Sequence, residues 1–204
     1  MKYLQIILLS LRKKLGKMKN IRILTLLIPA ILLISCSSNG DKQASEGTQT
    51  RSNVVPPGLV DEDKAKELIQ NATFTDLEGN EVSIDRFEGK VVLIDFWETW
   101  CGPCLQVFPA MDKLRDEYEN EFEVLAVTVG LSDSIEDARN FANENDYDFN
   151  YLIDTNNVFD QLGASGIPFK VLVNPDGELI KIEMGSRGTE GDYNQMKSII
   201  LEYI

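Results

Sequence analysis

The run Lys90–Trp97, KVVLIDFW, is apolar along nearly its whole length, and this run most constrains the fold. Such a strand is buried on both faces, as in a parallel or mixed sheet covered by helices. Directly after it, the segment from Pro103 to about Asn120 carries apolar side chains at the three-to-four spacing of a helix. We therefore expect a strand, a short loop and a helix inside a layered α/β domain.

The rest of residues 59–204 alternates between strand-like and helix-like patterns. Further strands are expected at Thr73–Leu77, Glu81–Ile84, Phe122–Val129, Phe149–Ile153, Lys170–Asn174 and Leu179–Met184; further helices are expected after Asp61 or Asp63 up to Ile69, at Ser134–Asn145, at Asn157–Leu162 and from about Glu190. The turn signals Glu78-Gly79-Asn80 and Pro175-Asp176-Gly177 each predict a hairpin. We expect Phe149–Ile153 to be an edge strand. The order predicts a central mixed sheet flanked by helices, with an added N-terminal hairpin.

Composition removes several classes of function. The chain has 204 residues, 3 Cys, no His and a formal net charge of −13. Without His it cannot form a Ser-His-Asp triad or an imidazole metal site, and three Cys do not fill a four-ligand zinc site. The acidic charge argues against nucleic-acid binding. We expect no metal and no cofactor, so the chemistry rests on the three cysteines Cys36, Cys101 and Cys104.

The N-terminal segment has the pattern of an export signal. Residues 1–35 contain seven of the 20 basic residues and no acidic residue. The apolar run Ile23–Ile34 would reach about 18 Å as a helix, against a bilayer core of about 30 Å. That length suits the apolar region of a signal peptide and not a membrane span. Because the segment from Met18 is by itself a complete signal, translation is hypothesised to start there.

The apolar run ends in Leu33-Ile34-Ser35-Cys36, which resembles the lipobox of bacterial lipoproteins. The resemblance implies that residues 1–35 are removed and that Cys36 carries the lipid, on the extracytoplasmic face of an inner or outer membrane. The alternative is that Cys36 is a buried residue of an apolar helix. Residues 36–58 are poor in apolar side chains, which predicts a flexible tether between the lipid and a domain at 59–204.

The other two cysteines lie in Trp100-Cys101-Gly102-Pro103-Cys104, between the buried strand and the helix. Free N–H groups and a partial positive charge at a helix N-terminus stabilise a thiolate, so Cys101 is expected to be the nucleophile with a lowered pKa. Cys104, one turn further on, can close a disulfide with it. Pro103 suits the first turn of a helix, and Trp100 can present a flat apolar surface to a partner.

From about Thr73 to Ile204 the sequence resembles the thioredoxin superfamily, specifically its TlpA/ResA-like membrane-tethered branch. The motif WCGPC after a buried strand and Ser165-Gly166-Ile167-Pro168 before the strand FKVLV carry the resemblance. It implies a thioredoxin-like fold and a cis Pro168 facing the disulfide. It also implies a substrate surface of Trp100, Gly102, Pro103, Ile167 and Pro168, on which the backbone of Ile167 pairs with an extended substrate segment.

Asp95 lies six residues before Cys101 and matches the buried acid of thioredoxins. A carboxylate inside an apolar strand is costly unless it is paired or functional. Leu125–Val129 contains no lysine to pair with it. We therefore expect an unpaired Asp95 with a raised pKa that acts as general base for Cys104. The alternative is that Asp95 points to a solvated edge.

These features predict a thiol-disulfide oxidoreductase that exchanges disulfides with extracytoplasmic protein partners, with reduction of the partner favoured. An upstream electron donor, either soluble or embedded in the membrane, would regenerate the dithiol. Cytochrome c biogenesis, repair of mispaired disulfides and electron supply to a reductase remain open as processes served. Four alternatives remain: a thiol peroxidase of the AhpC/TSA type, a non-catalytic lipoprotein binding module, a structural disulfide, and half of a zinc site shared across a dimer.

Overall fold

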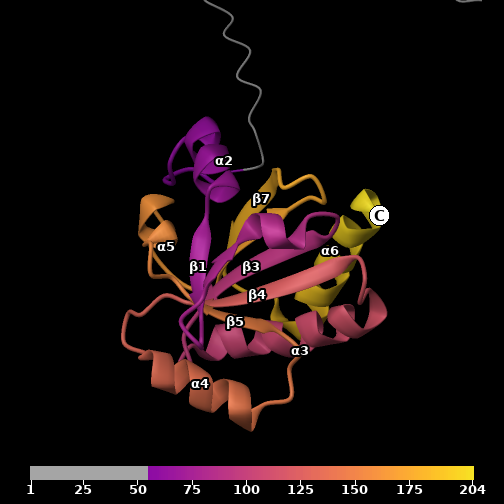
Figure 1. The fold of residues 1–204 in the computed structure, drawn as a ribbon. Helices are drawn as coiled ribbons and strands as arrows, with labels where there is room; N and C mark the ends of the chain where they lie inside the picture. The colour runs from indigo at the N-terminus through magenta and orange to yellow at the C-terminus, as the bar shows by residue number, and fades with distance from the viewer. Residues whose placement is uncertain (1–54) are drawn as a thin grey trace, which may run out of the picture. The chain divides into compact units, whose positions relative to one another are not determined.

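The computed structural model describes residues 55–204. The expected signal segment, Cys36 and most of the expected tether lie outside these residues. The described chain is built around one seven-stranded sheet of order β2-β1-β5-β4-β3-β6-β7 (Figure 1). None of the helices in residues 55–204 combines the length and the hydrophobicity that a membrane span requires.

The helices and strands follow the expected order. The strands are β1 (Thr73–Asp76), β2 (Glu81–Ser83), β3 (Val91–Trp97), β4 (Phe122–Thr128), β5 (Asn150–Ile153), β6 (Phe169–Val173) and β7 (Leu179–Met184). The α-helices are α2 (Glu62–Gln70), α3 (Gly102–Glu117), α4 (Ile135–Glu144), α5 (Val158–Gln161) and α6 (Gly188–Tyr203). A 3-10 helix, η1 (Ile84–Phe87), follows β2 and had no counterpart in the sequence prediction.

The sheet is mixed, as predicted. β3 pairs in parallel with β4 and antiparallel with β6, and every residue of β3 and β4 is buried. β1–β2 and β6–β7 are the two expected hairpins. The predicted helix start at Ser134 is also confirmed, because Ser134 and Asp137 form a reciprocal capping box at the start of α4.

The prediction that Phe149–Ile153 lies at an edge of the sheet is wrong. β5 pairs in parallel with β4 and antiparallel with β1, so the N-terminal hairpin covers its outer side. The edges of the sheet are β2 and β7. The local pattern of β5 contains no information about its partners, because the covering strand comes from residues more than 70 positions earlier in the chain.

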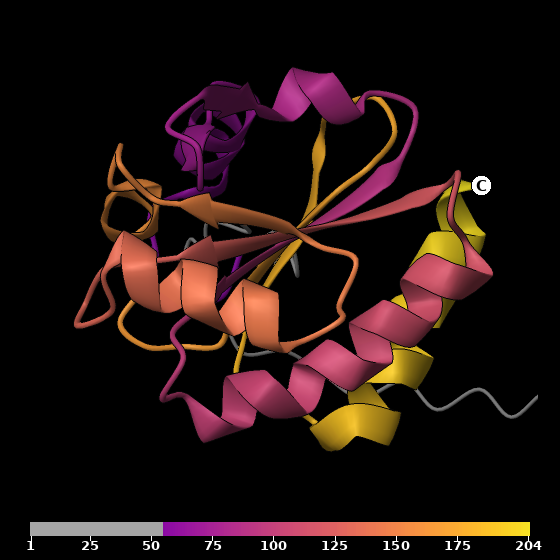
Figure 2. The ribbon, with the colours of Figure 1, turned by 60° about the horizontal axis from the view of Figure 1, so that its bottom comes forward.

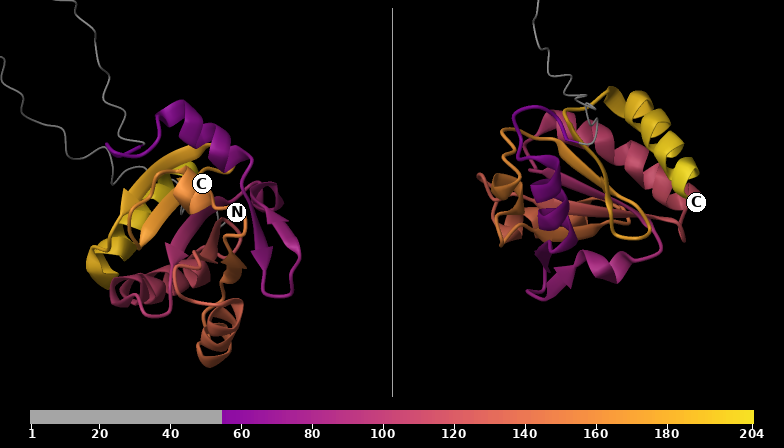
Figure 3. Two further views of the ribbon diagram at one scale, coloured as in Figure 1. Left: turned by 90° about the vertical axis from the view of Figure 1, so that its left-hand side faces the viewer. Right: turned by 90° about the horizontal axis from the view of Figure 1, so that it is seen from above.

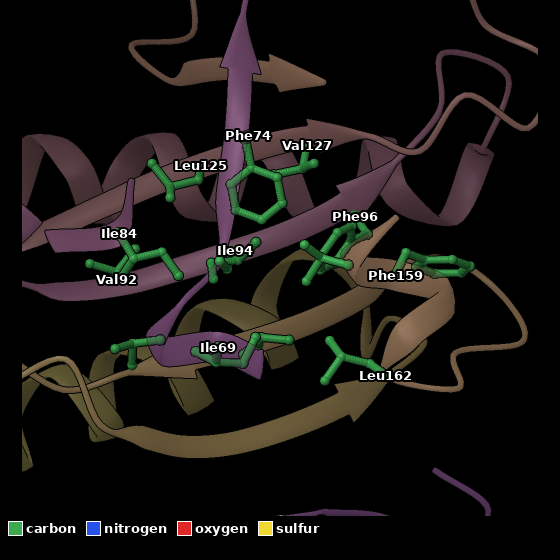
Figure 4. Close-up of a cluster of buried hydrophobic side chains, with 14 of the residues drawn as sticks. Ile69, Phe74, Ile84, Val92, Ile94, Phe96, Leu125, Val127, Phe159 and Leu162 are labelled. Atoms are coloured by element: carbon green, nitrogen blue, oxygen red, sulfur yellow. The ribbon is translucent and has the colours of Figure 1, made fainter. Parts of the chain in front are cut away.

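Helices cover both faces of the sheet (Figures 2 and 3). α3 and α6 pack on the face to which Val91, Leu93 and Leu172 contribute side chains, and α4 lies on the same side through Phe141. α2 and α5 pack on the opposite face, where Figure 4 shows Ile69 of α2 and Phe159 and Leu162 beside the strand side chains. Alternate residues of β3 therefore belong to two separate cores.

Candidate active site

The two cysteines lie where β3 passes into α3. β3 ends at Trp97, and α3 begins at Gly102 with Cys101 as its N-cap. Cys101 and Cys104 form a disulfide with their Cα atoms 5.2 Å apart. Pro103 is in the first turn of α3, where its missing N–H leaves no helical hydrogen bond unmade. The local geometry thus agrees with the expected strand, loop and helix.

The start of α3 provides a direct partner for the Cys101 sulfur. The backbone N–H of Cys104 donates a hydrogen bond to Sγ of Cys101 at 3.2 Å. In the reduced protein the same N–H, together with the partial positive charge of the helix N-terminus, would favour a thiolate on Cys101 over one on Cys104. This asymmetry is what a nucleophile and a resolving cysteine require.

An aromatic cluster packs beneath the disulfide. Trp97 and Phe108 lie in the same buried group as the two cysteines, and their ring centroids are 4.8 Å apart. Phe141 of α4 packs against Trp97 at 4.6 Å, and Phe149 packs against Phe108 at 5.2 Å. The disulfide is therefore backed by apolar side chains, and Cys101 and Cys104 are only 3% and 0% exposed.

The residues expected to form the partner surface differ in exposure. Trp100 is 58% exposed, and Gly102 and Pro103 are also exposed. The Ile167–Pro168 peptide bond is cis, as the resemblance implied. Ile167 is partly buried and packs against the cluster that contains both cysteines, whereas Pro168 is buried. The structure thus brings the CGPC segment together with a loop some 60 residues later in the sequence.

Glu98 is a buried carboxylate that the sequence reasoning missed. It accepts hydrogen bonds of 2.7–3.1 Å from the four backbone N–H groups of residues 130–133 and one of 3.2 Å from Nε1 of Trp100. Burial alone would raise the pKa of Glu98, but the backbone donors outweigh burial and hold this pKa below its usual range. Oγ1 of Thr99 adds a 3.0 Å hydrogen bond to Asp133. Together these contacts join the loop before Cys101 to the loop after β4.

Asp95 is fully buried on β3, which excludes the alternative of a solvated edge. Neither of its carboxylate oxygens has a hydrogen-bond partner among the described residues. Burial raises the pKa of Asp95 to about 8, while the charge of Lys170 acts to lower it and that of Asp192 to raise it. The expected raised pKa agrees with this environment. The side chain lies on the sheet face covered by α3, the helix that carries Cys104.

The inference that no lysine lies beside Asp95 is corrected. β4 indeed lacks one, but Lys170 of β6, the other neighbour of β3, is directly opposite Asp95 in the antiparallel register. Its Nζ forms a 2.6 Å ion pair with Asp192 of α6 and makes no hydrogen bond to Asp95. The one sequence signal for this arrangement was a lysine inside the apolar run FKVLV. The position of Asp192 in α6 had no such signal.

Comparison with known proteins shows a family match and several similar oxidoreductases. Residues 64–200 match the family described as Redoxin. The chain is 33% identical over 124 residues to the thiol-disulfide oxidoreductase ResA of Halalkalibacterium halodurans, covering 60% of this chain and 69% of that protein. It is 31% identical over 131 residues to ResA of Bacillus thuringiensis subsp. konkukian, covering 63% of this chain and 75% of that protein.

A solved structure shares the fold. It is a protein of Chlorobium tepidum provisionally described as the thiol:disulfide interchange protein DsbE, with a TM-score of 0.58 and 27% identity. The match covers 66% of this chain and 94% of that one. The redox-active cysteine pair, the thioredoxin-like sheet and the named relatives all indicate thiol-disulfide exchange. The chain therefore belongs to the Redoxin family and is a thiol-disulfide oxidoreductase.

Proposed function

We propose that the protein reduces disulfides of partner proteins outside the cytoplasm, with Cys101 as the attacking thiolate and Cys104 as the resolving thiol. The observation that most supports this assignment is the position of Cys101 as N-cap of α3, with its Sγ accepting the N–H of Cys104. A helix N-terminus stabilises negative charge on that sulfur. The exposed Trp100 beside it supplies apolar surface for a partner.

The exchange proceeds in two displacements. The Cys101 thiolate attacks one sulfur of the partner disulfide, a mixed disulfide forms, and the other partner sulfur leaves as a thiolate that takes up a proton. Cys104 then loses its proton and attacks Sγ of Cys101. The mixed disulfide breaks, the second partner sulfur leaves as a thiolate, and two electrons have passed from the protein to its partner.

Asp95 is proposed as the group that accepts the Cys104 proton. The pKa of Asp95, about 8, lies close to the pKa of an ordinary thiol, which is about 8.5. Proton transfer between the two groups is therefore nearly balanced in free energy. In the reverse direction the protonated Asp95 returns the proton to the Cys104 thiolate. A carboxyl group with an ordinary pKa near 4 would hold the proton too weakly for the return step.

The partner is proposed to dock as an extended segment. Trp100, Gly102 and Pro103 form the exposed side of the site, and the backbone of Ile167, before the cis Pro168, offers hydrogen bonds to the segment. Main-chain pairing of this kind is tolerant of partner sequence, whereas Trp100 adds apolar contact area. We expect no cofactor to take part in the exchange.

The place of action is proposed from the N-terminal sequence. A basic and apolar segment followed by Leu33-Ile34-Ser35-Cys36 supports export, cleavage and lipidation at Cys36. Labelled palmitate should be incorporated into the full-length protein and not into Cys36→Ser. Equal labelling of both proteins would argue against the lipid anchor. Mapping the N-terminus of the precursor tests the start at Met18.

The activity is tested by insulin-disulfide reduction with a chemical reductant as electron source. We expect turnover by the wild-type protein and none by Cys101→Ser. Turnover that survives Cys101→Ser would contradict the assignment. A reduction potential of the 101/104 pair below about −220 mV supports a reductant, and one near about −120 mV an oxidant. Consumption of hydrogen peroxide at a higher rate than insulin reduction would favour the peroxidase alternative.

A further inference from the structure

Three ionisable side chains are buried together next to the active site. Asp95 of β3 and Lys170 of β6 are Cα partners in the sheet, so their side chains leave the same face. Asp192 of α6 reaches the same place and ion-pairs with Lys170 at 2.6 Å. The side chains of Lys170 and Asp192 are 1% and 0% exposed, and Asp95 is fully buried. Solvent therefore screens none of these charges effectively.

The two carboxylates have unequal support. Asp192 binds Lys170 through Oδ1, and its Oδ2 accepts hydrogen bonds from Oγ of Ser186 at 2.6 Å and from the backbone N–H of Arg187 at 3.0 Å. Among residues 55–204, no group donates a hydrogen bond to either oxygen of Asp95. The charge of Lys170 thus mainly stabilises the carboxylate of Asp192. It stabilises a carboxylate on Asp95 more weakly, through space.

We propose that the Lys170–Asp192 ion pair sets the proton affinity of Asp95 and thereby the pH range in which Cys104 is deprotonated. Lys170 and Asp192 are positioning residues in this scheme, since they act through Asp95 and touch no substrate. The proposal rests on the role of Asp95 as proton acceptor described above.

Charge balance explains how the pair acts. With Asp95 protonated, the three side chains carry no net charge. When Asp95 loses its proton, two carboxylates face one ammonium and the group carries one negative charge in a buried site. A stronger ion pair between Asp192 and Lys170 raises the free energy of this deprotonated state, and a weaker ion pair lowers it. Neutralising Asp192 and neutralising Lys170 each break the pair, but they must shift the pKa of Asp95 in opposite directions.

The other groups on this sheet face differ in how far they can contribute. Cys104 is the resolving thiol of α3, and β4 presents the uncharged Ala126 opposite Asp95. Glu183 of β7 is opposite Lys170, but its carboxylate is paired with Lys181 and Arg187 and accepts a hydrogen bond from the Gln195 amide. The ionisable or charged groups around Asp95 are thus Lys170 of β6, Asp192 of α6, Cys104 of α3, Glu183 of β7 with its partners Lys181 and Arg187, and Tyr151 of β5, which is opposite Ala126.

The proposal is tested by direct titration of the Asp95 carboxyl group in the oxidised protein, using carbon-13 NMR with Asp95→Asn to assign the signal. Asp192→Asn leaves Lys170 without its partner, and the midpoint for Asp95 should fall by at least about one pH unit. Lys170→Met removes the positive charge, and the midpoint should rise by a similar amount. Lys170→Arg keeps the charge and should leave the midpoint within about half a unit of wild type.

Matched controls come from the same helix. Glu190→Gln removes an exposed carboxylate of α6, and Lys197→Met removes a lysine that pairs with Glu117. Neither should move the Asp95 midpoint. If Lys170→Met fails to fold, Lys170→Gln replaces it, because the amide restores polarity without charge. Shifts of the same sign in Asp192→Asn and the neutral Lys170 variant, or no shift in either, would overturn the proposal.

The pH dependence of thiol exchange provides the second readout. The rate of Cys104 attack on a preformed mixed disulfide should follow the same opposite shifts, and these shifts should vanish in the Asp95→Asn background. The NMR titration needs no turnover, so its result stands apart from the insulin assay. Failure of insulin reduction would contradict the proposed function, whereas failure of the opposite midpoint shifts would contradict the tuning role of the pair.

Discussion

The indole nitrogen of Trp100 donates a 3.2 Å hydrogen bond to Oε2 of Glu98, so an exposed aromatic ring beside the disulfide is held by a buried carboxylate. The same carboxylate binds the backbone of residues 130–133, which includes Leu131, another exposed apolar side chain. One residue thus fixes two separate loops, and one of them carries Trp100 of the proposed partner surface. A substitution of Glu98 therefore removes contacts of both loops.

Glu98→Gln should therefore weaken both the fold and partner binding. The amide replaces one acceptor oxygen by a donor that faces backbone N–H groups, which we expect to cost about 2 kcal/mol in the free energy of unfolding. The KM for insulin should rise several-fold because Trp100 is less well ordered. The rate with a small disulfide such as hydroxyethyl disulfide should hardly change, since it needs little surface.

Urea unfolding and steady-state kinetics measure these effects. Glu136→Gln is the matched control, because Glu136 lies on the exposed face of α4 and pairs with Arg139. Equal stability of Glu98→Gln and Glu136→Gln would show that the network around Glu98 contributes nothing measurable.

Cys104→Ser should trap the first intermediate. The reduced variant keeps Cys101 at the N-terminus of α3 and lacks the thiol that resolves the mixed disulfide. After incubation with insulin, a covalent adduct should accumulate and be detected by non-reducing mass spectrometry. Cys101→Ser serves as the comparison and should form little adduct. Preferential trapping by Cys101→Ser would reverse the assignment of the two cysteines.

Asp95 should make stability depend on pH. Its folded-state pKa of about 8 lies above the unfolded value of about 3.9, so between these values the folded protein holds a proton that the unfolded chain has lost. Stability from this group is complete below the unfolded pKa and falls as pH rises toward the folded pKa, by up to about 1.4 kcal/mol per pH unit. Above about pH 8 its contribution no longer changes.

Asp95→Asn removes this slope, so the variant should gain stability relative to wild type as pH rises. Urea unfolding of the oxidised proteins from about pH 5 to about pH 9 measures the difference. Asp146→Asn, at an exposed position, should show no such trend. A constant difference between Asp95→Asn and wild type across this range would mean that Asp95 has the same pKa in both states.

Phe108 should be a large contributor to the stability of the region under the disulfide. Its ring packs between Trp97 and Phe149, with centroids at 4.8 and 5.2 Å. Phe108→Ala should cost about 3–5 kcal/mol in the free energy of unfolding, because a buried ring leaves a cavity. Leu131→Ala, at a 58% exposed position, should change it by no more than about 0.5 kcal/mol. Similar costs for the two variants would contradict the role of the aromatic cluster.

Much of the domain could be predicted because its signals are local. The unbroken apolar run of β3, the proline and cysteines at the start of α3 and the turn triplets of the two hairpins act within a few residues of one another. The same holds for the Ser134 cap, whose partner is three residues away. Hydrophobic periodicity, capping and turn chemistry are short-range properties, and a single sequence contains them.

The redox pair, the helix that carries it and an acid in the strand before it could be predicted from the sequence. The groups that surround this acid could not, because they come from other layers of the fold. Lys170 lies opposite Asp95 because β6 pairs with β3 in one register, and Asp192 completes the group because α6 packs over that face. Glu98 likewise meets residues more than 30 positions away, and β5 is internal because the hairpin pairs with it. Such contacts follow from strand register and the packing of whole layers, which depend on the summed free energy of the domain. A local pattern can mark an unusual residue, such as the lysine in FKVLV, but does not specify its partner.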